Sequence, residues 1–170
     1  MARPKLISDA AILAIVRERV LRAGDKAVSF REVAAATGLS APALVLRFSS
    51  QSAMVSAALV AGWQALGALA ASAAQDLGQS PKSMQEFLKL QADFIDIPAL
   101  LTHSLRDAPA KAAAAEYRAS LEGILAQHLG GGIAAKGTAG AIFAAWQGRI
   151  AWGEAGGKTY RFGEFLRNVT

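Results

Sequence analysis

The feature that most constrains the fold is a pair of helix-start signals separated by a glycine. Ser29 and Glu32 have the S-x-x-E spacing of a capping box, in which each side chain satisfies a backbone N–H of the other residue. Ser40 is a second N-cap candidate, and Pro42 falls in the first turn after it, where a missing N–H costs little. Gly38 lies between the two signals and can adopt the left-handed backbone of a sharp turn. Two short capped helices joined in this way predict a helix-turn-helix.

Helix-forming residues dominate the rest of the chain. Ala, Leu, Gln and Glu are frequent, and no alternating β-rich run has a useful length. Ser8 and Gly24 are suited to begin and end a first helix. After the two short helices we expect a long helix to about residue 77, and then helices at about 83–97, 98–106, 110–129, 138–153 and 160–168. The sequence therefore predicts an all-α fold of about nine helices, with an N-terminal three-helix helix-turn-helix head and a C-terminal helical bundle.

Basic residues are concentrated near the N-terminus. Residues 1–48 hold eight basic and four acidic side chains, a net charge of +4, whereas the other 122 residues hold ten basic and nine acidic ones. A basic head on a nearly neutral body is the electrostatic footprint of a protein that binds a polyanion such as nucleic acid. Charge alone leaves open a solvated surface that is merely basic.

The chain lacks the residues of a metal site or a catalytic centre. Cysteine is absent, which fits the reducing cytoplasm, where we expect the protein to act. The only histidines, His103 and His128, are far apart in the sequence and have no carboxylates at ligand spacing. No nucleophile, base and orienting group form a recognisable set. We therefore expect no metal, no cofactor and no enzymatic activity.

An uncharged stretch over residues 48–75 is long enough to cross a bilayer. It is built largely from Ala, Ser, Gly and Gln, which gain little from lipid, and no aromatic belt flanks it. We expect a buried helix of a soluble protein here, with a membrane-associated helix as a distant alternative.

The segment 29–54 carries a set of residues that spans the two short helices and the turn between them. They are Arg31, Glu32, Val33, Ala34, Gly38, Leu39, Ser40, Leu44, Phe48 and Ser50. Together these residues resemble the signature of the TetR family of transcriptional regulators. The preceding helix and the predicted layout of the whole chain, three short helices, a long linking helix and a bundle, also resemble that family. This resemblance implies a one-component repressor that binds a near-palindromic DNA operator as a homodimer and is released by a small apolar ligand.

Three positions depart from the family signature. The family's Tyr is Val45 here, its His is Arg47, and its Lys is Gln51. The Tyr and Lys of the family typically touch DNA phosphate, so their loss removes a hydrogen-bond donor and a charge from the grip on the backbone. These departures keep open an alternative function, a dimeric helical module that binds a ligand or a protein and has weakened or lost DNA binding.

The resemblance places the DNA-binding head at residues 1–48 and the regulatory, ligand-binding and dimerisation part at residues 49–170. In the head it implies that Arg31 reads a base in the major groove and that Arg47 meets phosphate, unless Arg31 instead pairs with a nearby carboxylate such as Glu32 or Asp25. The expected DNA contacts are Arg31, Ser40, Ala41, Pro42, Ala43, Val45, Arg47 and Gln51.

Two further sites are expected in the regulatory part. An apolar cavity between its helices would bind the ligand, lined by some of Trp63, Phe94, His103, Tyr117 and Leu121. The last two helices carry an apolar face that, if exposed, marks a two-fold contact between subunits. The residues of this face are Ala139, Ile142, Phe143, Trp146, Ile150, Phe162 and Leu166.

Overall fold

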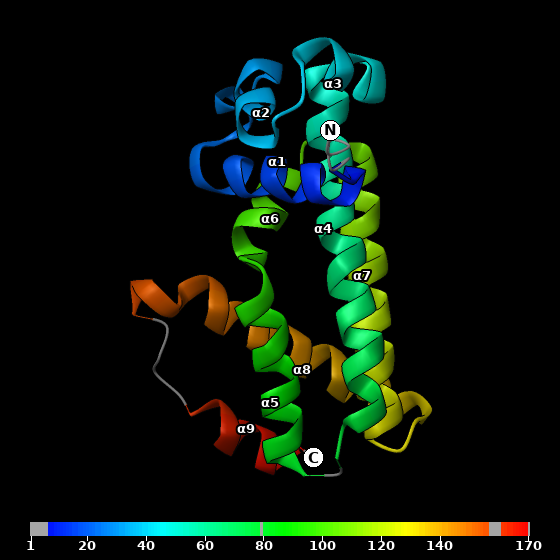
Figure 1. Ribbon diagram of the computed structural model, residues 1–170. Coiled ribbons are helices and arrows are strands. Elements are labelled where there is room, and N and C mark those ends of the chain that lie inside the picture. Colours follow the sequence, from blue (N-terminus) through cyan, green and yellow to red (C-terminus); the bar gives the residue numbers. More distant parts are fainter. Residues whose placement is uncertain (1–6, 79, 157–160, 170) are drawn as a thin grey trace. The chain divides into compact units, whose positions relative to one another are not determined.

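A computed structural model describes residues 7–78, 80–156 and 161–169. All regular structure in these ranges is helical, with nine α-helices and three short 3₁₀ helices, so the predicted all-α fold is confirmed (Figure 1). The chain divides into two compact units. The first comprises the chain up to Trp63 together with Ala99–Ala114, and the second comprises Gln64–Pro98 and Ala115–Thr170.

Three short helices open the first unit: α1 (Asp9–Ala23), α2 (Phe30–Thr37) and α3 (Ala41–Phe48). They lie together in Figure 1, where α2 packs against both α1 and α3. As predicted, Ser8 is the N-cap of α1 and Gly24 its C-cap, with a positive φ of 80° that favours glycine. A single 3₁₀ turn, η1 (Asp25–Ala27), leads to α2. The residues of this group that are fully buried include Ile12, Val16, Val20, Val28, Val33 and Leu44.

The first unit also holds the N-terminal part of α4 (Gln51–Ala73), most of α6 (Ile97–Ser104) and the start of α7 (Ala108–His128). Trp63 of α4 donates its indole N–H to Ser104 Oγ at 2.9 Å, and Ser56 donates its hydroxyl to Asp107 Oδ1 at 3.0 Å. The same Asp107 oxygen accepts the backbone N–H of Ala110 at 2.8 Å, which satisfies a free donor at the start of α7. These bonds fix α4 to the corner between α6 and α7.

Gly62 allows a close approach within this unit. A Cβ added to Gly62 on α4 would lie 2.8 Å from Cδ of Arg17 on α1 and 3.3 Å from Leu100 on α6. A larger residue would therefore force these side chains to shift, so the missing side chain lets Arg17 and Leu100 lie close to α4.

The second unit contains α5 (Pro81–Phe94), α8 (Gly132–Trp152) and α9 (Phe162–Val169), together with the remaining parts of α4 and α7. Helix α9 packs against α5 and α8. The Arg118 guanidinium of α7 lies 5.3 Å from the centre of the Phe143 ring on α8, a cation–π contact. Two 3₁₀ turns follow α4 and α8: η2 (Ala74–Asp76) and η3 (Gly153–Ala155).

The boundaries and facing of α5 differ from the prediction. Ser80 caps this helix, which ends at Phe94 rather than near residue 97. Phe94, which we expected to line a cavity, is half-exposed and Leu90 is exposed, whereas the buried side carries Met84, Phe87, Leu88 and Gln91. A helix with apolar residues on two sides does not specify which side faces the core, and here the side that includes a glutamine is buried.

Helix α4, continued by η2 to Asp76, is the one helix in the described residues that is long and apolar enough to cross a membrane. Core helices of soluble proteins pass the same test. Its buried residues include Met54, Ala58, Leu66 and Ala70. Their helical spacing is what a core helix requires.

Candidate nucleic-acid interface

Local hydrogen bonds define the helix-turn-helix. Ser29 Oγ accepts the backbone N–H of Glu32 at 3.2 Å, and the Glu32 carboxylate accepts the backbone N–H of Ser29 at 2.9 Å. Gly38 ends α2 in the left-handed conformation, with φ 72°, and donates its N–H to the Ala34 carbonyl at 2.9 Å. The predicted capping box and turn are therefore both present, and they fix the direction in which the chain enters α3.

Helix α3 is anchored on one side and exposed on the other. Ser40 Oγ accepts the backbone N–H of Ala43 at 3.3 Å, and Leu44 is fully buried against the head. The outer side presents Pro42, Val45 and Leu46, and the relative exposure of Leu46 is 88%. Sequence reasoning missed Leu46, although a helical residue two positions after a buried one points away from the core.

Arg31, the second residue of α2, is exposed. Among the described residues no carboxylate lies within ion-pair distance of its guanidinium. The two predicted competitors are bonded elsewhere, because Glu32 caps α2 and Asp25 accepts the backbone N–H of Lys26 at 3.1 Å. Arg31 is thus available to an external partner.

Arg47 is held by the head itself. Its Nη1 lies 3.1 Å from Asp9 Oδ1 and donates to the Ile7 carbonyl at 3.3 Å, and its side chain is 25% exposed. This ion pair reduces what Arg47 offers to a phosphate, which the sequence alone did not reveal. Gln51, another of the expected DNA contacts, is exposed at the start of α4.

Comparison of the whole structure with solved proteins identifies the fold. A TetR transcriptional regulator from Legionella pneumophila superposes with a TM-score of 0.72 at 16% identity, over 96% of each chain. A TetR-family transcriptional regulator from Rhodococcus sp. superposes with a TM-score of 0.56 at 15% identity, over 95% of this chain and 93% of the other. The chain has the TetR fold. No family model matches the sequence, and no curated protein is similar to it.

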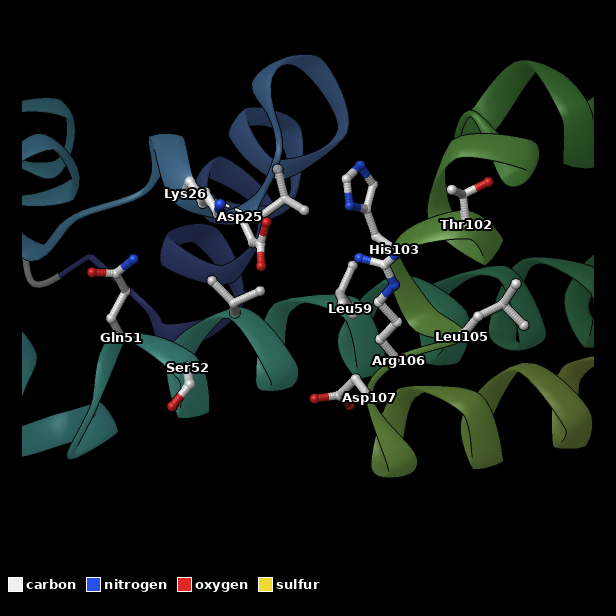
Figure 2. Close-up of a pocket in the computed structure, with 12 residues that line it drawn as sticks. Asp25, Lys26, Gln51, Ser52, Leu59, Thr102, His103, Leu105, Arg106 and Asp107 are labelled. Atoms are coloured by element: carbon white, nitrogen blue, oxygen red, sulfur yellow. Dashed lines mark hydrogen bonds between the residues drawn. The ribbon is translucent and has the colours of Figure 1, made fainter.

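The first unit of this TetR fold contains a cleft of about 580 Å³ (Figure 2). Its walls come from the end of α1, from η1, from the start of α4 and from the α6–α7 corner. Val20, Val55 and Leu59 are apolar and buried, whereas Lys26, His103 and Arg106 bring nitrogen groups to the lining. The volume lies in the range of small-molecule sites, and the mixed lining suits a ligand with both apolar and polar parts.

The five residues predicted to bind ligand do not form one described cavity. Trp63 and His103 belong to the first unit, but only His103 lines the cleft, because Trp63 is buried and bonded to Ser104. In the second unit Tyr117 and Leu121 are buried, whereas Phe94 is half-exposed. Burial raises the pKa of the Tyr117 phenol well above its ordinary value.

Gln91 is an unusual residue in the core of the second unit. Its side chain on α5 is fully buried, and neither its amide oxygen nor its amide nitrogen has a hydrogen-bond partner in the described part of the chain. A buried polar group without partners costs about 1–3 kcal/mol. Such a group indicates a place where a water or a polar ligand atom belongs.

Most of the face predicted to join two subunits is buried within one chain. Of its seven residues, only Phe143 and Ile150 remain partly exposed. Helical periodicity shows that a face is buried but not whether its own chain or a partner covers it, and here the chain itself covers five of the seven residues. The residues buried inside the second unit are Ala139, Ile142, Trp146, Phe162 and Leu166.

Proposed function

We propose that this protein is a sequence-specific DNA-binding transcriptional regulator whose head, residues 1–48, binds DNA and whose remainder, residues 49–170, regulates it. The observation that carries the proposal is the helix-turn-helix, in which α3 is anchored by Leu44 and exposes its other side beside a helix with an unpaired Arg31. The positive charge of the head and the TetR fold support the same function.

In this function the outer side of α3 enters the major groove, led by its N-terminus. Arg31 on α2 reads a guanine through two parallel hydrogen bonds to O6 and N7. The start of α3 makes small contacts with the bases through the short side chains of Ser40, Ala41 and Ala43.

A two-fold homodimer follows from this function, because two heads would read two half-sites of a near-palindromic operator. We propose that helices α8 and α9 form the contact between the two subunits. The contact uses side chains outside the buried face, and the partly exposed Phe143 and Ile150 lie at the edge of that face. Light scattering tests this directly: a monomer at micromolar concentration contradicts it.

Repression relieved by a small molecule is the proposed regulation. The cleft beside His103 supports it, because a ligand there would touch η1 of the head and the α6–α7 corner at once. A ligand that prefers one arrangement of these segments shifts the population that binds DNA. The lining favours a ligand with a polar group rather than a wholly apolar one.

Selection of duplexes from a random pool by the full chain tests the function. Enrichment of near-palindromic sequences that are retained in a mobility shift supports it. A pool that stays random through repeated rounds contradicts it.

A second candidate is a helical module that has lost DNA binding and acts through protein or ligand contacts. The Arg47–Asp9 ion pair favours it, together with Val45 and Gln51, which replace phosphate-binding residues of the TetR signature. This candidate expects no enrichment in the selection, and it expects the exposed side of α3 to be covered by a protein.

A further inference from the structure

The outer side of α3 has an unusual composition for a helix that would read bases. Pro42, Val45 and Leu46 lie on that side at helical spacing and are exposed, Val45 at 45% and Leu46 at 88%. We call these three residues the α3 patch. Single exposed apolar residues are common on protein surfaces, but here three neighbours share one small helix face.

Polar groups on α3 are few. Ser40 Oγ is already bonded to the backbone N–H of Ala43, and the Arg47 guanidinium is bonded to Asp9 and to the Ile7 carbonyl. The helix contains no Asn, Gln, Lys, Asp or Glu. Guanine, adenine and cytosine are distinguished in the major groove by hydrogen bonds to their edges, whereas thymine also presents a methyl group.

We propose that the α3 patch reads thymine, by packing Leu46 and Val45 against 5-methyl groups in each half-site. This inference rests on the proposed function, because it assigns the base class that the head would recognise. A protein partner would also cover an apolar patch, but the surrounding charge favours DNA. The head carries a net charge of +4, and α2, which packs against α3, exposes Arg31 without a carboxylate partner among the described residues.

The division of labour follows from the chemistry of the two helices. Arg31 supplies the one guanidinium of α2 and α3 that has no partner among the described residues, and it suits guanine. The α3 patch supplies methyl and methylene groups, which gain free energy only where an apolar group of the DNA removes them from water. A half-site should therefore combine a guanine with one or more thymines.

Uracil substitution tests the inference, because uracil lacks only the 5-methyl group of thymine. Duplexes selected by the full chain from a random pool are resynthesised with uracil in place of a single thymine at a time, and affinity is measured by fluorescence anisotropy. Burying one methyl group contributes about 0.8 kcal/mol, so each contacted thymine should lose about fourfold in affinity on conversion to uracil.

Leu46→Ala provides the matching protein variant, since a side chain that is 88% exposed can be shortened without disturbing the core. At the thymine that Leu46 contacts, this variant should bind the thymine and uracil duplexes equally. Leu90→Ala is the control, because Leu90 is an exposed leucine of α5 in the second unit. It should retain the full fourfold loss.

The outcomes separate this inference from the proposed function. If selected duplexes bind specifically but uracil changes no affinity, or if Leu46→Ala retains the loss at every position, thymine reading is wrong and the function stands. If no duplex is enriched, the proposed function fails and the inference fails with it. If no duplex is enriched and Leu46→Ala changes the oligomeric state of the protein, a second copy of the chain covers the α3 patch and thymine reading is wrong.

Discussion

Asp9→Ala is expected to strengthen DNA binding without altering sequence preference, because it releases Arg47. In the native head the two side chains form an ion pair of 3.1 Å, with Asp9 66% exposed and Arg47 25% exposed. Removing the carboxylate leaves Arg47 with only the neutral Ile7 carbonyl as an acceptor. A charge that is no longer compensated becomes available to phosphate.

The magnitudes decide what the experiment should show. An exposed ion pair contributes about 0.2–1 kcal/mol to stability, and an acidic residue in the first turn of a helix adds about 0.3–1 kcal/mol. The variant should therefore lose no more than about 2 kcal/mol of unfolding free energy and remain folded. One additional phosphate contact steepens the dependence of log K on log salt by about 0.9.

Fluorescence anisotropy with a random-sequence duplex at several salt concentrations measures this slope. Asp25→Ala is the matched control, because it removes the same charge from the head while Asp25 has no ion pair in the described structure. Equal slopes for the two variants would refute the release of Arg47. A second result would also refute the release of Arg47. If Arg47→Ala in the otherwise native protein lowered the salt slope by about 0.9, Arg47 would already contact phosphate before Asp9 is removed.

Three further substitutions test separate parts of the structure. Arg31→Ala should cost about 1–3 kcal/mol on a selected duplex and relax preference at one base pair per half-site, so equal losses on selected and random DNA would contradict base reading. Ser29→Ala removes the capping box with Glu32 and should lower the unfolding free energy by about 0.5–2 kcal/mol in urea denaturation, and an unchanged value would show that the cap contributes nothing. Gln91→Met should raise it by about 1–3 kcal/mol, whereas a decrease would mean that a bound water or ligand already satisfies the amide.

The boundaries of the helices within the head could be predicted from the sequence because they depend on local chemistry. Ser8, Gly24, Ser29 and Gly38 act on backbone groups within four residues of themselves, and each has the predicted role. The Arg47–Asp9 pair depends instead on how α3 packs beside the start of α1 and joins residues that are 38 positions apart. No local pattern encodes that contact.

The second unit was harder to predict for a related reason. Phe94 and Trp146 are both aromatic residues on helices of this unit, yet Phe94 is half-exposed and Trp146 is buried. Periodicity identifies a face that prefers burial but does not say which neighbour covers it. The burial of Gln91 was also unexpected, because a glutamine between apolar residues is ordinarily placed on the exposed side.

The affinity ratio of the full chain for a selected duplex and a random duplex of equal length, measured by anisotropy in the same buffer, tests DNA recognition most directly. Sequence-specific proteins typically prefer their sites by 10³-fold or more, and the helix-turn-helix with its unpaired Arg31 predicts a ratio of at least about that size. Equal affinities for the two duplexes would contradict sequence-specific recognition by this head.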